Sequence, residues 1–259
     1  MDLLVALPGA LAIGLSLGLL GSGGSILTVP VLVYLLQQDE KVAIAGSLFI
    51  VGSIATAGSL QFLRGGFVQW RSVLIFGVPG MIGTWLGAVI AAYVAGVVQL
   101  ALFALVMLLA SYLMLRPPDL QHAGRGTRAA WKIALDGLVV GVITGLVGVG
   151  GGFLIVPALV LLGGLTMHQA VATSLVIIAL KSYSGFYKYL DVLAQQSLTL
   201  EWRTLLVVTA VGIAGSLAGG RLARRVPQQK LRRWFGLFLI AMGIYILARS
   251  LPAALGLIH

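Results

Sequence analysis

The chain lacks cysteine and has few charges. The absence of cysteine among 259 residues excludes disulfides, thiolate metal sites and cysteine nucleophiles. Charged residues make up 9% of the chain, hydrophobic residues make up 59%, and the mean hydropathy is +1.07. Apolar runs of about 20 residues, the length that spans a hydrocarbon core, recur throughout. The composition predicts an all-α polytopic membrane protein with one domain over residues 1–259.

Acidic residues are scarce. Six of the seven fall in expected ends or loops, and Asp136 lies just inside an apolar segment. No Asp, Glu or His pair occupies a mid-membrane position, so a carboxylate proton relay is poorly supported. There is no P-loop either, so ATP-driven transport would need a separate subunit. Facilitated diffusion or coupling through the substrate's own proton fits better, and Lys181 leaves a proton-coupled route open. We expect no cofactor and no metal.

Basic residues give the chain a formal charge of +10. Their clusters lie between apolar runs, which is typical of cytoplasmic loops facing anionic headgroups and not of nucleic-acid binding. The N-terminus, "MDLLVALPGALAIG", is acidic where a signal peptide would be basic, so we expect a retained segment. The run "RLARRVPQQKLRRW" is expected to fix orientation and touch anionic lipid; gathering substrate anions or docking a partner are the alternatives. Its basic residues are Arg221, Arg224, Arg225, Lys230, Arg232 and Arg233.

A glycine-rich motif is written twice. "GLLGSGGSILTVP" begins at Gly18, and "GLVGVGGGFLIVP" begins at Gly145, a shift of 127 residues. Further along, a shift of 132 places Trp70 on Trp202. We therefore predict two homologous repeats, and paired broken segments of this kind indicate a midplane binding site. The repeats cover about 1–116 and about 131–251, with a basic loop at about 117–130.

Each repeat contains four apolar segments, and the first is broken by the glycine motif. Leu3–Leu36 and Trp131–Leu162 are too long for one crossing at 1.5 Å per residue. Single crossings throughout would place nine basic residues on one side and seven on the other, whereas a broken hairpin in each first segment gives twelve against four. The positive-inside rule favours hairpins, which makes the repeats inverted. Both termini then lie outside a prokaryotic-type inner membrane, and the basic loops are cytoplasmic.

Three features carry a family resemblance. They are the repeated "GxGG[GS]xxxVP", the stretch "ATSLVIIALKSYSGF" from Ala172 to Phe186, and a "GxxxG" followed by a basic loop in each repeat. With these features the chain resembles the TauE/SafE family of sulfite and organosulfonate exporters over nearly its whole length. The resemblance implies a secondary transporter for a small sulfur-containing anion: sulfite, thiosulfate or a sulfonate.

The glycine clusters support two interpretations. Unwound backbone and half-helix N-termini could point N–H groups at an anion, where the helix dipole also favours negative charge. Alternatively, glycine lets two helices approach closely. Under the first interpretation the substrate-binding residues are Gly23, Gly24, Ser25, Gly150, Gly151 and Gly152.

Lys181 is a cation well inside an apolar segment, and its repeat counterpart is Ile54. Such a residue usually faces a cavity or a partner, and an ammonium would complement a dehydrated oxyanion. The alternative is that Lys181 extends along its own helix to the membrane interface. Nearby hydroxyls are further candidates, although hydroxyls in membrane helices often bond to their own turn. They are Ser47, Thr173, Ser174, Ser182 and Tyr183.

Two other functions were weighed. A passive anion channel would use the same lining groups as a carrier. An intramembrane serine protease, suggested by "SYSGF" around Ser184, needs a histidine within reach. His122 and His259 lie in a loop and at the terminus, and His168 is about four turns away. We therefore expect a transporter and not an enzyme. A homo-oligomer is compatible with the sequence.

Overall fold

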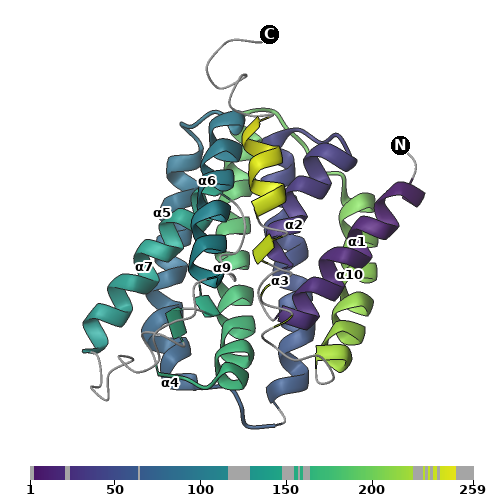
Figure 1. Ribbon diagram of the computed structural model, residues 1–259. Coiled ribbons are helices and arrows are strands. Elements are labelled where there is room, and N and C mark those ends of the chain that lie inside the picture. The colour runs from purple at the N-terminus through teal and green to yellow at the C-terminus, as the bar shows by residue number, and fades with distance from the viewer. Residues whose placement is uncertain are drawn as a thin grey trace.

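The computed structural model describes residues 3–20, 24–63, 65–115, 129–147, 155–156, 158–159, 164–223, 230, 233, 236–237 and 240–248. All regular structure in these residues is helical (Figure 1). Five of the described helical spans are long and apolar enough to cross a membrane, which confirms the all-α polytopic prediction. They are Glu40–Leu60, Trp70–Ala91, Ala130–Val147, Gln169–Gln195 and Trp202–Leu222.

The first segment of the chain folds back on itself. It consists of α1 (Leu3–Leu20), α2 (Ser25–Pro30) and a π-helical turn, η1 (Val31–Leu35). A methyl group built on Gly24 would lie 2.4 Å from Ile13 O, and one built on Gly9 would lie 2.8 Å from Val31 Cγ1. The return arm therefore runs antiparallel to α1. The corresponding stretch of the second half, which begins with the second glycine motif, lies largely outside the described residues.

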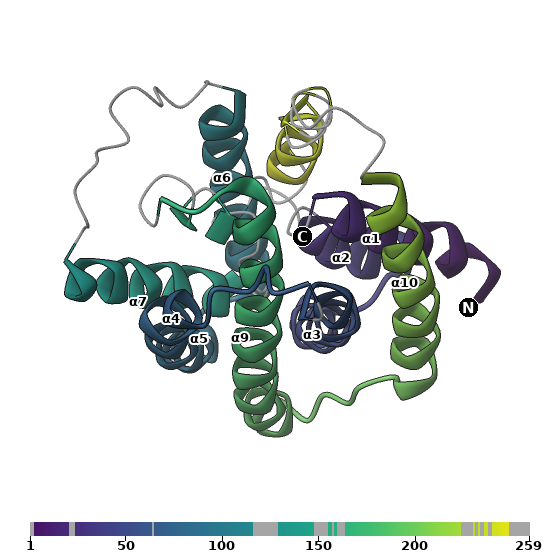
Figure 2. The same cartoon turned by 90° about the horizontal axis from the view of Figure 1, so that it is seen from below.

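Two long antiparallel helices occupy the centre. They are α3 (Glu40–Leu63) and α9 (Met167–Gln195), and Figure 2 shows them side by side between the flanking helices. Gly52 faces Ser182, and Gly58 faces Leu175. The start of α9 is fixed by a capping box between Thr166 and Gln169. The helix extends to Gln195, five residues beyond the apolar run, with Lys188 and Asp191 paired at 2.8 Å near its end.

A tightly packed helix pair flanks the centre on each side. One pair is α1 with α10 (Trp202–Ala223); the other is α7 (Ala130–Val147) with α5 (Val78–Ala91). The helix containing α5 begins with α4 (Trp70–Ser72) and widens into a π-helical turn, η2 (Val73–Gly77). Pro79 follows this turn. Because a proline ring clashes with the carbonyl four residues earlier, here within η2, a widened turn accommodates it.

The flanking pairs are held together through glycine. A Cβ on Gly14 would lie 2.1 Å from Gly212 O, and a Cβ on Gly145 would lie 2.2 Å from Thr84 O. The sequence spaces these glycines four apart, as Gly14/Gly18, Gly83/Gly87, Gly141/Gly145 and Gly215/Gly219. Each of the eight would place a Cβ within 3.0 Å of facing backbone. Because these positions carry no side chain, the helix backbones approach each other closely.

The contacts in one flanking helix pair are related to those in the other by the same shifts of 127 and 132 residues that relate the two halves of the sequence. Gly14 meets Gly212, and adding 127 to the first number and subtracting 132 from the second gives the contact of Gly141 with Gly80. The contact of Gly18 with Ser216 becomes, in the same way, that of Gly145 with Thr84. The first segment of each half thus packs against the third segment of the other half.

Basic residues at the helix ends divide into two sets, one at each end of the bundle. The starts of α4 and α7 and the end of α10 lie at the bottom of Figure 1, and they carry Arg71, Lys132 and Arg221. The start of α3, the end of α9 and the start of α10 lie at the opposite end, with Lys41, Lys188 and Arg203. This is the distribution that the hairpin arrangement predicts.

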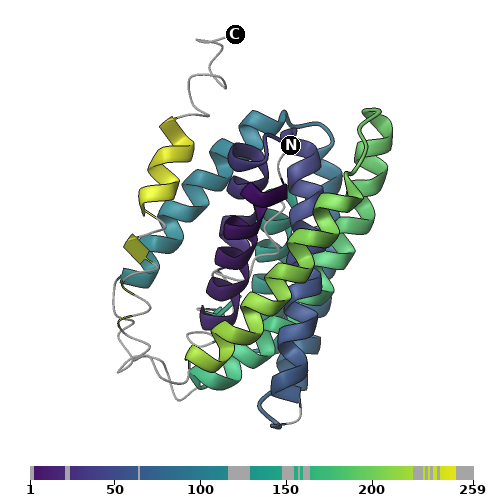
Figure 3. The same cartoon turned by 90° about the vertical axis from the view of Figure 1, so that its right-hand side faces the viewer.

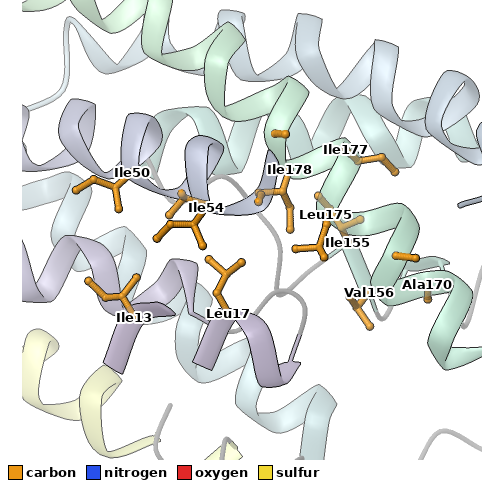
Figure 4. Packing of buried hydrophobic residues seen from close by; sticks show 14 of the residues in the cluster. Ile13, Leu17, Ile50, Ile54, Ile155, Val156, Ala170, Leu175, Ile177 and Ile178 are labelled. Carbon is orange, nitrogen blue, oxygen red and sulfur yellow. The ribbon is translucent and has the colours of Figure 1, made fainter. Parts of the chain in front are cut away.

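Apolar residues from several segments meet between the central helices. Figure 4 shows Ile13 and Leu17 of α1 beside Ile50 and Ile54 of α3, with Ile178 of α9 close by. All five are buried in one cluster. The helix α6 (Gly96–Leu115) and the helix at 240–248 lie together on one side of the bundle (Figure 3). A methyl group on Gly243 would lie 3.0 Å from Leu108 Cδ2, so these two helices are in direct contact.

Candidate functional site

Lys181 lies at the centre of α9, with fourteen helical residues on either side. Its side chain is fully buried, and its Nζ has no hydrogen-bond partner among the described residues. The aliphatic part passes over Gly80 of α5, where an added Cβ would lie 3.0 Å from Lys181 Cδ and 3.3 Å from Gly137 O of α7. The side chain is therefore enclosed by α9, α5 and α7. This burial contradicts the alternative in which Lys181 reaches the membrane interface.

The equivalent place in the other half holds an isoleucine. Ile54 of α3 lies over Gly212 of α10, where an added Cβ would be 2.4 Å from Ile54 Cδ1 and 3.7 Å from Ala10 O. Subtracting 127 from Lys181 gives Ile54, and adding 132 to Gly80 gives Gly212. The same site between helices thus holds an apolar side chain in one half and an ammonium in the other. Packing alone does not require a charge there.

Ser182 adds a second buried polar group without a partner. Its side chain is fully buried, and its Oγ makes no hydrogen bond. It faces α3, because a Cβ on Gly52 would lie 3.1 Å from Ser182 Cβ. Tyr183 follows on the same side, and its hydroxyl lies 3.2 Å from Ser53 Oγ. Consecutive residues at the middle of α9 therefore carry two polar groups that the described protein leaves unsatisfied.

Threonine and glycine continue the α5–α9 contact one turn further on. A methyl group on Gly185 would lie 2.7 Å from Thr84 Cγ2, and Ser184 Oγ donates to Met81 O at 3.1 Å. The buried Thr84 hydroxyl donates to Gly80 O at 2.8 Å. The hydroxyl groups of Ser184 and Thr84 are thus already bonded to backbone, which leaves Lys181 and Ser182 as the groups free to bind a ligand.

Three other candidate hydroxyls have structural partners. Ser47 donates to Ile44 O and Ser174 to Val171 O, each at 2.8 Å within its own helix. Thr173 Oγ1 accepts from the backbone N–H of Gln69 at 3.0 Å and so anchors the turn before α4 on α9. The bonds of Ser47 and Ser174 are the own-turn bonds that were the alternative for these hydroxyls, whereas Thr173 instead binds another segment of the chain.

The glycine motifs are described only in part. Gly24 lies against Ile13 and Leu17 of α1, so close packing is its evident role. Ser25, which opens α2, is fully buried. The remaining candidates, Gly23, Gly150, Gly151 and Gly152, lie outside the described residues. Among the lipid-contact candidates, Arg221, Lys230 and Arg233 are exposed, and Arg224, Arg225 and Arg232 lie outside the described residues.

A polar network not anticipated from the sequence caps the end of α7. Gln99 Nε2 on α6 donates to Leu146 O at 2.8 Å and to the Tyr189 hydroxyl at 3.2 Å. The Tyr189 hydroxyl donates to the same carbonyl at 3.1 Å. Carbonyls in the last turn of a helix lack intrahelical partners, so these donors secure α7 immediately before the second glycine motif. An isolated amide in the apolar run of α6 was the available sequence signal.

We expect Tyr189→Phe and Gln99→Leu each to lower the free energy of unfolding by about 1–2 kcal/mol, because each removes a buried hydrogen bond to Leu146 O. Thermal unfolding of the purified protein in detergent measures this. Tyr187→Phe is the matched control, since the Tyr187 side chain is 72% exposed. Equal unfolding temperatures for the Tyr189 and Tyr187 variants would contradict a capping role.

The fold defines a polytopic α-helical membrane protein with an ammonium enclosed at its centre. The family model "Sulfite exporter TauE/SafE" matches residues 6–246, so the chain belongs to this family. A "Probable membrane transporter protein" of Xylella fastidiosa (strain Temecula1 / ATCC 700964) is 34% identical over 256 residues, covering 96% of each chain. The "Probable membrane transporter protein YunE" of Bacillus subtilis (strain 168) is 29% identical, covering 88% of this chain and 91% of its own. No solved structure matches.

These relatives bear on the class of protein. They are named as membrane transporters, and the family assignment covers nearly the whole chain. The chain is accordingly a multi-pass membrane transporter and not an enzyme. The serine protease alternative gains no support, because the hydroxyl of Ser184 is bonded to the backbone carbonyl of Met81.

Proposed function

We propose that the protein is a secondary transporter for a small sulfur-containing anion such as sulfite, thiosulfate or a sulfonate. The observation that carries the proposal is the pair of buried, unpartnered polar groups at the middle of α9, Lys181 Nζ and Ser182 Oγ. An unpaired ammonium in a membrane interior costs several kcal/mol, and a bound oxyanion supplies the missing charge and acceptors. The family name, which refers to sulfite, supports the choice of anion.

A site at this position suits alternating access. We propose that the two halves are inverted repeats and that the binding site lies near the axis relating them, where α3 and α9 cross. Recurrence of the glycine contacts at shifts of 127 and 132 supports this symmetry. Rocking of one pair of flanking helices against the other would then open the centre to each side in turn. The end with Arg71, Lys132 and Arg221 is proposed to face the cytoplasm of an inner membrane, because the hairpin arrangement assigns twelve basic residues to that side and four to the other.

Thiosulfate counterflow into proteoliposomes tests the proposal. Vesicles containing purified protein and unlabelled thiosulfate are diluted into trace labelled thiosulfate, and we expect transient accumulation of label inside. A carrier produces this overshoot because internal substrate drives the exchange, whereas a pore only lets the label equilibrate. Labelled sulfite is run in parallel, with protein-free vesicles as the control.

Two results would count against the proposal. Equilibration without an overshoot, together with unitary currents in planar bilayers, would favour the passive anion channel. Exchange of neither anion above the protein-free control would mean that the transporter carries a different class of substrate.

A further inference from the structure

Among the described residues, no charged group is hydrogen-bonded to Lys181 Nζ. α9 packs against α3, η2, α5 and α7, and η2 and α5 contain no charged residue. Charges on α3 and α7 are confined to their first two turns: Glu40, Lys41, Lys132 and Asp136. The other titratable groups of α9 are His168, Tyr183, Tyr187, Lys188, Tyr189 and Asp191. Lys181 Nζ makes no hydrogen bond to any of them.

Three of the other titratable side chains of α9 already have hydrogen-bond or ion-pair partners. Tyr183 pairs with Ser53, Tyr189 with Gln99 and the Leu146 carbonyl, and Lys188 with Asp191. Asp136 is half-buried beside Gly137, on a helix that also faces Lys181. The environment of Lys181 therefore supplies packing on its aliphatic part and no anion for its ammonium.

This arrangement creates a difficulty for the return of an empty carrier. After the anion leaves, the carrier would hold an uncompensated ammonium in its dry centre while its helices rearrange. Burying an unpaired charge costs several kcal/mol, which would slow that rearrangement severely. Release of the proton along with the anion removes the charge. The Ile54 site in the other half demonstrates that a neutral side chain is accommodated in this geometry.

We infer that Lys181 carries a proton together with each anion, so that the protein is a proton–anion cotransporter that is electroneutral for a monoanion such as a sulfonate. The inference rests on the proposed function. On the loading side an amine at Lys181 takes a proton from water, and the ammonium binds the anion. On the other side the anion departs and an N–H bond of the ammonium breaks, with the proton passing to water. One proton and one monoanion cross together, and the amine returns uncharged. Anion binding and proton binding at this site then strengthen each other.

Methanesulfonate is the probe that isolates a proton carried by the protein, because this strong-acid anion takes up no proton near neutral pH. Proteoliposomes hold a pH-sensitive dye, and the membrane voltage is clamped at zero with potassium and valinomycin. With the outside one pH unit more acidic, we expect about tenfold accumulation of labelled methanesulfonate and acidification of the interior at one proton per anion.

Lys181→Arg separates anion binding from proton release. Arginine stays charged at every accessible pH, so in this variant the ratio of pH-driven accumulation to anion exchange is expected to fall well below that of the wild type. Ile54→Met, a volume-conserving change at the equivalent uncharged site, is the matched control and should retain both activities.

Three results would overturn the inference, and they differ in what else they affect. Wild-type exchange of methanesulfonate without pH-driven accumulation would overturn proton coupling alone and leave an anion carrier. pH-driven accumulation that persists in Lys181→Arg would overturn Lys181 as the proton carrier and leave a cotransporter whose proton binds elsewhere. Absence of exchange for both thiosulfate and methanesulfonate would overturn the proposed function and, with it, this inference.

Discussion

Replacing Lys181 by methionine should abolish anion transport and make the protein more stable. Methionine fills the space over Gly80 without a charge, as Ile54 does over Gly212. Loss of one partner of a buried charged pair costs about 2–5 kcal/mol in binding, so uptake of labelled thiosulfate should fall at least about thirtyfold. Removing a buried amino group that has no hydrogen-bond partner among the described residues should meanwhile raise the unfolding temperature.

The opposite changes in function and stability distinguish a binding residue from a structural one. Ile54→Met is the control, because it also places methionine against a glycine, here Gly212. This variant should change neither transport nor stability by much. A Lys181→Met protein that transports normally would remove Lys181 from the site. A variant that loses transport because it unfolds would indicate that the ammonium has a structural role.

The sequence predicted the helices and the importance of Lys181 for two different reasons. Helix number and length follow from apolar runs of membrane-spanning length. Lys181 was conspicuous because a cation in such a run is costly wherever its side chain points. Its orientation was not predictable, since helices that are apolar all around show no difference between lipid-facing and buried sides. Only the contact with Gly80 establishes that Lys181 faces the protein interior.

The hydrogen-bond network at the end of α7 could not be predicted from the sequence. Gln99 is 47 residues from Leu146 and 90 residues from Tyr189. Nothing local in the sequence links these three residues, and α6, α7 and α9 must assemble before the hydrogen bonds exist. Hydroxyl side chains posed a related problem. Ser47 and Ser174 were candidates by residue type, and the structure bonds each to its own helical turn.

The glycine contacts lead to the second large expected effect. Gly145→Ala should lower the free energy of unfolding by about 2 kcal/mol or more, because the new Cβ would lie 2.2 Å from Thr84 O. Backbone cannot move aside as a flexible side chain can, so α5 and α7 must separate. Gly18→Ala should cause a similar loss, since its Cβ would lie 2.2 Å from Ser216 O in the other flanking pair. Thermal unfolding in detergent measures both.

Gly58→Ala is the matched control, because its Cβ would have no neighbour nearer than 3.5 Å. Alanine is the better helix former by about 1 kcal/mol, so this variant should be as stable as the wild type or slightly more stable. A symmetric pair of interfaces requires the Gly145 and Gly18 variants to behave alike. If only one of them were destabilised, the two flanking pairs would differ in strength, and the case for rocking two equivalent halves around Lys181 would be weaker. Equal destabilisation, with Gly58→Ala unaffected, would place both pairs among the rigid parts of the transporter.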